Sequence, residues 1–333
     1  MPQTFDIAII GATGTVGETL VQVLEERNFP VGNLHLLASI ESAGASVPFR
    51  GKSVRVREVE QFDFSQVRIA FFAAGAAVTR SFAARASAAG CMVIDLSGEL
   101  AAPHVVPEVN AAVLDALKTP VQLGSPSSSA VALALILAPL REQLGLVKVN
   151  VTVAMAVSAL GREAVSELAR QTAELLNARP LEPRFFDRQV AFNLLPQVGK
   201  LDEQGHGSLE KRLVSELREL LELPLLKISV TCVQAPVFFG DSLTVSVQTE
   251  RAVDLAAVNT ALDSAEGVEW VEEGDYPTPV GDAVGQDVVY VGRVRTGIDD
   301  TCELNLWATL DNVRKGAALN AVQLAELLIK DQL

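Results

Sequence analysis

A glycine-rich turn near the start of the chain constrains the fold more than any other feature. Residues 11–17 read GATGTVG and directly follow the compact apolar run Phe5–Ile10. From Thr15 to Arg27, apolar residues then recur at helical spacing. A strand, turn and helix in this order place free N–H groups at a positively polarised helix end, close to a bound pyrophosphate. The pattern predicts a dinucleotide-binding turn, with a simple packing turn as the alternative.

The region after this turn alternates short apolar runs with helical stretches such as Val78–Ala89. The further runs of strand length are Leu34–Ser39, Val67–Ala74, Met92–Leu96 and Pro120–Leu123. Fully apolar strands with helices between them are typical of a parallel sheet that is covered on both faces. The first part of the chain is therefore predicted to be a Rossmann-type, doubly wound α/β domain.

The pattern changes after about residue 147, where longer strands with partial alternation begin. These strands are Val147–Val157, Lys227–Val233, Leu243–Thr249, Val288–Arg295 and Cys302–Leu310. Helical segments at about 161–178 and 209–222 interrupt them, which predicts a mixed or antiparallel sheet with helices on one side. In the second helix we expect Glu210, Arg212 and Glu216 on the solvated side. A final helix is predicted over Asn312–Ile329.

Charge and cysteine content exclude several classes of protein. The 333 residues include 27 Lys or Arg and 41 Asp or Glu, for a net charge of −14, which argues against nucleic-acid and membrane-surface binding. The three cysteines are scattered, so neither a disulfide framework nor a CxxC-type metal site is indicated. The N-terminus lacks the features of a secretory signal, and the longest apolar stretch, Ala130–Leu140, is too short to span a membrane. We therefore expect a reduced, cytoplasmic protein without a metal.

An acidic residue follows the glycine turn at the distance that a ribose contact requires. Glu41 comes 24 residues after Gly17, just past the apolar run Leu34–Ala38. A carboxylate here would bond a ribose 2′-hydroxyl and repel a 2′-phosphate. It therefore favours NAD over NADP, unless Glu41 is an ordinary solvated loop residue.

Several segments together resemble aspartate-semialdehyde dehydrogenase over nearly the whole chain. They are GATGTVG (11–17), LASIESAG (37–44), VVPEVN (105–110), AVSALGREAV (156–165), AFNLLPQVG (191–199), YPTP (276–279), VGRVR (291–295) and DNVRKGAALNAVQLAE (311–326). The last segment is long and specific. The sequence is identified as a divergent, Usg-type member of that family.

The resemblance implies two domains and a homodimer. Residues 1–127 with 313–333 would form the Rossmann-type dinucleotide-binding domain, and residues 128–312 a second α+β domain for dimerisation and substrate. The cofactor contacts carried over from the family motifs fall on Gly11, Thr13, Gly14, Thr15, Val16, Gly17, Ser39, Glu41, Ser158, Gly161 and Asn312. The cofactor expected is NAD, and a protein without any bound cofactor is the alternative.

The resemblance also implies a reaction, and the residues for that reaction are replaced. Family members use a cysteine nucleophile, a histidine acid/base, a positioning glutamine and arginines for the substrate carboxylate and phosphate. At the matching positions this chain has Ser128 for the cysteine, Asp241 for the histidine, Met155 for the glutamine, and Gln234 and Ala101 for arginines. Glu41 replaces a further arginine that would bind a cofactor 2′-phosphate. Arg212 is a candidate anion-binding residue if the register of its helix matches.

These replacements remove the chemistry of the family. A thiol with a pKa of about 8.5 is partly ionised near neutrality, whereas an alcohol is not. An aspartate with a pKa near about 3.9 is a poor base for a hydroxyl unless burial raises that pKa. His35, His104 and His206 all lie outside the matched catalytic segments. Loss of one positioned acid/base group costs about 10²–10⁴-fold in rate, so loss of the whole set should leave little of this reaction.

Three functions remain open from the sequence. The first is a family member that keeps the fold, the dimer and a nucleotide pocket without semialdehyde dehydrogenase activity. The second is an active NAD-dependent oxidoreductase on an aldehyde or oxo substrate, with non-cysteine chemistry involving Asp241 or Ser128. The third is a protein-interaction dimer with a vestigial pocket. A serine hydrolase is not indicated, because a GxSxG elbow and a matched histidine are missing, and the serines at 125–129 also suit a helix N-cap.

Overall fold

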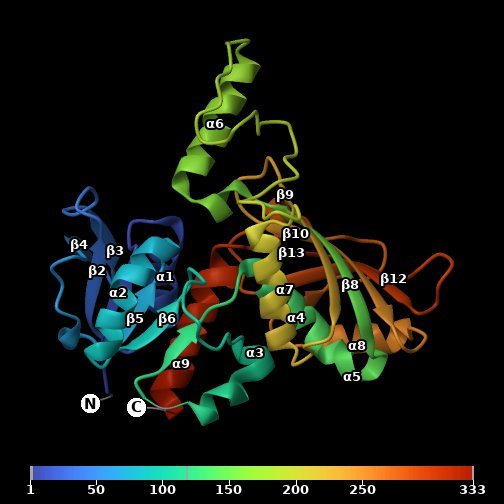
Figure 1. Cartoon of the computed structure of the whole chain (residues 1–333), viewed down its shortest axis with the longest axis horizontal. Helices are drawn as coiled ribbons and strands as arrows, with labels where there is room; N and C mark the ends of the chain where they lie inside the picture. Colours follow the sequence, from blue (N-terminus) through green and yellow to red (C-terminus); the bar gives the residue numbers. More distant parts are fainter. Residues whose placement is uncertain (1–2, 118, 332–333) are drawn as a thin grey trace. The chain divides into compact units, whose positions relative to one another are not determined.

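The structure is a computed structural model that describes residues 3–117 and 119–331, and the chain folds into two compact units (Figure 1). The first unit comprises Met1–Ser127 with Ala317–Leu333, and the second comprises Ser128–Gly316. The sequence placed the return to the first unit at residue 313. The second unit continues to Gly316 because residues 311–316 bond within it: Gly316 N donates to the carbonyl oxygen of Asp311.

The first unit is built on a seven-stranded sheet with the strand order β3-β4-β2-β1-β5-β6-β7. Its parallel strands are β1 (Phe5–Ile10), β2 (Val31–Ala38), β4 (Lys52–Glu58), β5 (Ile69–Phe72), β6 (Met92–Asp95) and β7 (Gln122–Gly124). The predicted parallel sheet is confirmed. The sequence missed β4 and its antiparallel partner β3 (Ser46–Phe49), which together form a hairpin at the sheet edge.

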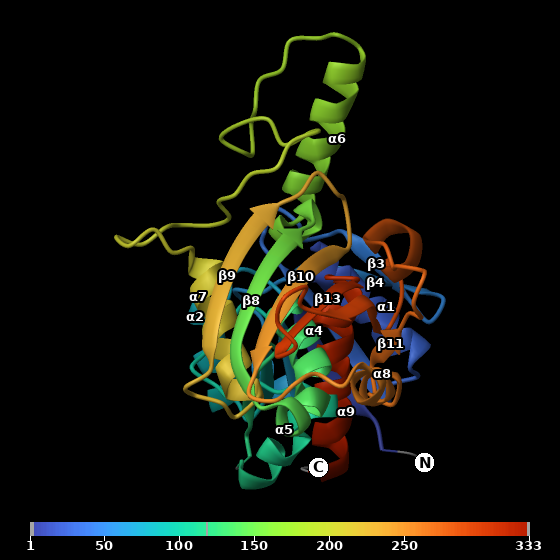
Figure 2. The ribbon, with the colours of Figure 1, turned by 90° about the vertical axis from the view of Figure 1, so that its right-hand side faces the viewer.

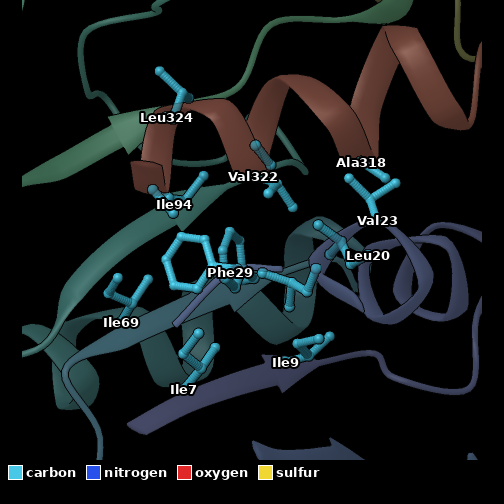
Figure 3. Packing of buried hydrophobic residues seen from close by; sticks show 14 of the residues in the cluster. Ile7, Ile9, Leu20, Val23, Phe29, Ile69, Ile94, Ala318, Val322 and Leu324 are labelled. Atoms are coloured by element: carbon cyan, nitrogen blue, oxygen red, sulfur yellow. The ribbon is translucent and has the colours of Figure 1, made fainter. Parts of the chain in front are cut away.

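Alternate residues of β1 face opposite sides of this sheet, and each side has its own apolar core. Ile7 and Ile9 belong to the core that α1 (Thr15–Glu26) and α9 (Asn320–Asp331) cover, as Figure 3 shows. Ala8 and Ile10 belong to the other core, beneath α2 (Ala76–Ala88). A strand that is buried on both faces explains why Ile7–Ile10 is continuously apolar, whereas Asp6, near the start of the strand, is only partly buried. The short helical segments α3 (Pro107–Asn110), Phe64–Gln66 and Ala111–Ala116 complete the unit.

The last helix begins later than the sequence indicated. Residues Arg314–Leu319 form a π-helical turn, and the α-helix α9 starts at Asn320. Val322, Ala325 and Leu328 are fully buried, while Ile329 packs at the margin of the same core. The predicted helix is therefore present, but its α-helical part starts later than residue 312.

The second unit contains a six-stranded mixed sheet with the strand order β11-β12-β13-β10-β8-β9. The strands are β8 (Leu146–Met155), β9 (Lys227–Gln234), β10 (Asp241–Thr249), β11 (Val268–Trp270), β12 (Val289–Thr296) and β13 (Glu303–Leu310). β8 pairs with β9 and β11 pairs with β12 in parallel, while the other neighbours are antiparallel. The predicted mixed sheet is confirmed.

Three helices of the second unit pack against this sheet: α4 (Ser128–Leu137), α7 (Ser208–Leu220) and α8 (Leu255–Asp263). The helix predicted near 209–222 is therefore placed as expected, whereas α6 (Arg162–Leu176), predicted near 161–178, makes its main contacts with the turn Val157–Leu160. α5 (Arg141–Leu144) and single turns at Ala138–Leu140 and Pro279–Ala283 complete the unit. Every residue of α4 from Ser129 onward is buried, which explains its uniformly apolar sequence. Figure 2 shows α6 and the irregular segment after it extending away from the sheet. In the described part of the chain, no helix has both the length and the apolar character that crossing a bilayer requires.

Candidate functional site

The glycine turn of the first unit connects β1 to α1 in a conformation that a side chain would prevent. Gly11 has φ +89°, and a Cβ on it would lie 2.8 Å from the backbone of Ala73. A Cβ on Gly17 would overlap the carbonyl oxygen of Gly11. These two glycines let α1 start directly against the sheet, with Gly14 as its N-cap.

This turn fits a dinucleotide phosphate. The first N–H groups of α1 have no partner within the helix, so they are available to an anion. Thr15 Oγ1 is buried there and has no hydrogen-bond partner among the described residues. Thr13 and Val16 are partly exposed in the same turn. The glycines leave room for a bound group, and the Thr15 hydroxyl can bond to it. Both features suit the pyrophosphate that the motif predicts.

Ser39 and Glu41 emerge beside the same turn. β2 runs parallel to β1 with Leu37 opposite Ile10, and Gly11 N donates to the carbonyl oxygen of Leu37 at 2.8 Å. The exposed turn after β2, where Ser42 N donates to the carbonyl oxygen of Ser39 at 3.1 Å, carries the exposed Glu41. The Glu41 carboxylate therefore lies at the carboxyl ends of the parallel strands. The ribose of a dinucleotide whose pyrophosphate is bound at the glycine turn would lie at the same place.

Two of the replaced reaction residues meet on neighbouring strands of the second unit. Met155 ends β8 and is paired with Gln234, which ends β9. Gln234 is buried, and its Nε2 donates to the carbonyl oxygen of Met155 at 2.7 Å. Gln234 Oε1 has no partner within the described chain. A buried neutral amide that is bonded to the backbone provides no charge with which to hold an anionic substrate.

Asp241 begins β10 next to these residues and is buried with one carboxylate oxygen unsatisfied. Its Oδ1 accepts a 2.9 Å hydrogen bond from Ala156 N, while no described residue donates to Oδ2. Burial raises the pKa of Asp241 from its ordinary value of 3.8 to about 7, and the nearby Asp311 carboxylate adds to this rise. The Ala156 N–H and the Ser128 hydroxyl offset part of it. Asp241 can therefore exchange a proton near neutral pH.

Ser128, at the start of α4, lies beside this carboxylate. Its Oγ is buried and, like Asp241 Oδ2, makes no hydrogen bond of regular geometry among the described residues, but the hydroxyl is close enough to lower the pKa of Asp241. The backbone of Gly316 covers the hydroxyl, because a Cβ on Gly316 would overlap Ser128 Oγ. A hydroxyl held in this way is poorly placed to attack a substrate.

The cofactor candidates of the second unit bond to one another. Asn312 Nδ2 donates to Ser158 Oγ at 3.0 Å, and Asn312 Oδ1 accepts from Gly240 N at 3.0 Å. Both side chains are buried. Gly161, with φ +91°, joins the turn after Ser158 to α6. These contacts hold β10 and the segment after β13 to the end of β8.

Arg212 is engaged by an acidic neighbour, which corrects one expectation. Its Nε donates to Glu216 Oε1 at 2.6 Å, and Glu216 is buried. The sequence had placed Glu216 on the solvated side of the helix. Because Arg212 supplies a counter-charge within one turn, the carboxylate can be buried and the guanidinium charge is largely neutralised. An anionic ligand would have to compete with Glu216.

Two buried polar residues of the first unit were not anticipated. Asn320 Nδ2 donates to Ser125 Oγ at 3.0 Å and to the carbonyl oxygen of Val105 at 3.1 Å. The Asp95 carboxylate, at the end of β6, accepts hydrogen bonds from the backbone N–H groups of Ser97, Glu99 and Leu100. A charged residue at the end of an apolar strand was the available signal for Asp95. Among the described residues, no cluster of acidic, His or Cys side chains could hold a metal ion.

Comparison with known proteins gives a consistent result over both units. The model of the semialdehyde dehydrogenase NAD-binding domain matches residues 6–117, and that of the semialdehyde dehydrogenase dimerisation domain matches residues 137–315. The chain is 63% identical to the USG-1 protein homolog of Azotobacter vinelandii, over 99% of each chain.

Two solved structures have the same fold over nearly the whole chain. A probable aspartate-semialdehyde dehydrogenase from Pseudomonas aeruginosa is 58% identical, with a TM-score of 0.97 over 99% of this chain and 100% of that one. Aspartate-semialdehyde dehydrogenase II from Vibrio cholerae, solved in complex with ASA, is 42% identical, also with a TM-score of 0.97 and the same coverage.

Proposed function

The chain belongs to the aspartate-semialdehyde dehydrogenase family, and from this premise we propose that it is a nucleotide-binding homodimer that has lost semialdehyde dehydrogenase activity. The observation that carries the proposal is the state of Ser128. Where the family resemblance places a reactive thiol, this chain has an alcohol whose oxygen is buried against Gly316. An alcohol needs a base that takes its proton, and a covered alcohol cannot reach a carbonyl carbon.

The loss of anion-binding groups supports the same proposal. Gln234 and Ala101 stand where arginines would bind the substrate carboxylate and phosphate, and Gln234 is bonded to the backbone. Arg212 is held by the buried Glu216. An anionic semialdehyde or phosphate would therefore meet few positive charges here and, at Asp241, a group that becomes negative above about pH 7.

The proposed ligand is NAD rather than NADP. The glycine turn and the helix end behind it can hold the pyrophosphate, and Glu41 lies at the edge beside that turn. Its carboxylate would accept hydrogen bonds from the ribose hydroxyls and would repel a 2′-phosphate. When bound, this cofactor would supply hydride transfer, whereas the residues of the chain bind and orient it.

The open face of the second sheet is the surface that we propose for the homodimer. Thr231, Thr152, Thr244 and Trp307 form a row of paired neighbours across β9, β8, β10 and β13. The three threonines are exposed, although Thr152 and Thr244 lie on inner strands of the six-stranded sheet. The opposite face of the same strands carries the buried valines and leucines of the core. An exposed polar face on regular strands suits a second copy related by a twofold axis.

A second function is favoured by Asp241. Its pKa of about 7 gives this chain a group that can act as an acid or base near neutral pH. An NAD-dependent oxidoreductase that transfers hydride without a covalent intermediate could use this carboxyl to hold the proton on a substrate oxygen. We rank it second because the site built above from the described residues includes no group that would bind such a substrate.

Calorimetric titration with NAD, NADP and AMP, followed by a dehydrogenase assay on the same sample, tests both functions. We expect NAD to bind and the rate with aspartate-semialdehyde, phosphate and either cofactor to stay at background. Turnover at ordinary enzyme rates, a kcat of about 1–10³ s⁻¹, would refute the first proposal. If neither dinucleotide binds at millimolar concentration, both functions are refuted, and a protein-interaction dimer with a vestigial pocket is the alternative that remains.

A further inference from the structure

A cavity in the second unit opens where one strand stops beside a longer one. β11 ends at Trp270, which pairs with Val291, while β12 continues to Thr296 with no further strand paired on that side among the described residues. α8 packs against both strands, and residues of the loop 271–276 line the cavity between them. The cavity has a volume of about 550 Å³, which is within the range of small-molecule sites.

A bulge in β12 turns two arginines to this cavity. Gly292 pairs with Trp307 and Arg295 with Asn305, so two residues of β12, Arg293 and Val294, stand opposite a single residue of β13. Arg293 has φ +54°, a left-handed conformation that is costly for a residue with a side chain. Bulges often redirect side chains at functional sites, and strained residues cluster there. Both Arg293 and Arg295 line the cavity.

The other lining groups supply aromatic surface and one unsatisfied acceptor. Trp270 and the largely exposed Tyr276 border the cavity. Asn259, on α8, also lines it, and its buried Oδ1 has no hydrogen-bond partner in the described structure. Because an orphaned buried acceptor is costly, a ligand that donates a hydrogen bond to it would be favoured.

The charges of the lining restrict the ligand further. Neither arginine forms an ion pair with a carboxylate in the described ranges, and Arg295 Nη1 donates to the carbonyl oxygen of Arg293 at 2.7 Å. Two exposed carboxylates, Glu273 and Asp275, also line the cavity, and Asp275 Oδ1 accepts from Tyr276 N at 2.8 Å. Two positive and two negative side chains leave the lining near neutral. A monoanion is therefore favoured over a dianion such as a phosphate.

We propose that this cavity binds a small aromatic carboxylate that also carries a hydrogen-bond donor. Its ring would lie against Trp270 and Tyr276, and its carboxylate would meet the planar guanidinium groups of Arg293 and Arg295. Its donor would reach Asn259 Oδ1. The site lies within the second unit and is independent of dinucleotide binding at the glycine turn.

Calorimetric titration of the intact protein with indole-3-carboxylate tests this proposal, because the probe combines the ring, the N–H and the carboxylate. We expect a Kd between about ten micromolar and one millimolar, the range for a ligand of this size. The neutral indole-3-carboxamide should bind at least about tenfold more weakly, because it lacks the charge-assisted hydrogen bonds. Inorganic phosphate should produce no heat of binding and should not compete with indole-3-carboxylate.

Variants separate this cavity from other sites. Arg295→Gln should weaken indole-3-carboxylate about tenfold, whereas Arg188→Gln, which changes an exposed arginine far along the chain, should leave it unchanged. Asn259→Leu should weaken indole-3-carboxylate but not 1-naphthoate, which has no N–H, and it removes an orphaned acceptor without a folding penalty. If a thermal melt shows that Arg295→Gln does not fold, the affinities of Asn259→Leu for the two ligands still test the proposal. No binding at millimolar concentration, equal affinity for the carboxamide, or unchanged affinity in the variants overturns the proposal.

Discussion

The side-chain amide of Gln234 donates a 2.7 Å hydrogen bond to the backbone carbonyl of Met155. The family resemblance places an arginine and a glutamine of the reaction at these two positions, so the bond joins two replaced residues. Next to them, Asp241 accepts from Ala156 N and lies beside Ser128. The four residues at the predicted reaction positions thus form one packed group. A change that restores the family residue at one position therefore still lacks the family residues at the other three.

We therefore expect the single change Ser128→Cys to remain inactive with aspartate-semialdehyde, phosphate and either NAD or NADP. The new thiol would lie beneath Gly316 and beside a carboxylate, which disfavours the thiolate. The measurement is cofactor reduction followed by absorbance, with the triple variant Ser128→Cys, Gln234→Arg, Asp241→His as comparison. Turnover of about 1 s⁻¹ by the single variant would contradict the loss of the whole set.

Stability should depend on pH through Asp241. The folded pKa is about 7 and the ordinary value is 3.8, so between these values the folded chain retains a proton that the unfolded chain has lost. The free energy of unfolding should therefore fall as the pH rises from about 4 to about 7, by up to roughly 4 kcal/mol. Asp241→Asn cannot ionise and should show no such fall, so it should stabilise the protein at about pH 8.5 and change little at about pH 4.

Urea unfolding across this pH range is the measurement for Asp241. Asp263→Asn, a change at the exposed end of α8, is the matched control and should keep the pH dependence of the wild type. Parallel curves for the wild type and Asp241→Asn would show that this carboxyl is not the group responsible.

Most strands of both sheets could be predicted because their apolar runs are long enough to stand out from the rest of the sequence. The missed elements have weaker signals. β3 and β4 form an edge hairpin rich in Arg, Lys and Ser, β11 has three residues, and α8 has nine. Edge strands and short helices bury few side chains, so their sequences carry little periodicity.

The resemblance predicts which residues stand at the reaction positions, but it does not predict their physical state. The charged side of α7 looked solvated, yet Glu216 is buried because Arg212 pairs with it. The raised pKa of Asp241 depends on the depth at which β10 starts and on Asp311, which lies 70 residues later in the chain. Burial that arises from packing between distant segments cannot be derived from a local pattern.

Gly17→Ala should destabilise the first unit and abolish NAD binding. A Cβ there would overlap the carbonyl oxygen of Gly11, so α1 would have to move away from β1. We expect a loss of more than about 2 kcal/mol in the free energy of unfolding. Gly75→Ala is a matched control, because Gly75 also caps a helix and a Cβ there meets no atom within 4 Å. If both variants have the same stability and the same affinity for NAD, the predicted overlap between a Cβ at position 17 and the Gly11 carbonyl oxygen is refuted.

Glu41→Arg should reverse the cofactor preference. The carboxylate at the edge beside the glycine turn disfavours a 2′-phosphate, whereas a guanidinium would bind it through charge-assisted hydrogen bonds. Calorimetry should then show NADP binding about tenfold or more tightly than NAD, while Glu203→Arg, an exposed change in the second unit, retains the NAD preference. If the wild type binds NADP as tightly as NAD, Glu41 is an ordinary solvated residue.

Thr244→Arg should convert the proposed dimer to a monomer. Thr244 lies in the middle of the open sheet face, between its partners Thr152 and Trp307. Around a twofold axis each substitution would place an unpaired charge in the interface, and a buried unpaired charge costs about 3–5 kcal/mol. Thr260→Arg, on an exposed position of α8, should leave the dimer intact. Sedimentation at micromolar concentration distinguishes the two states, and a dimer that persists in Thr244→Arg would move the interface away from this face.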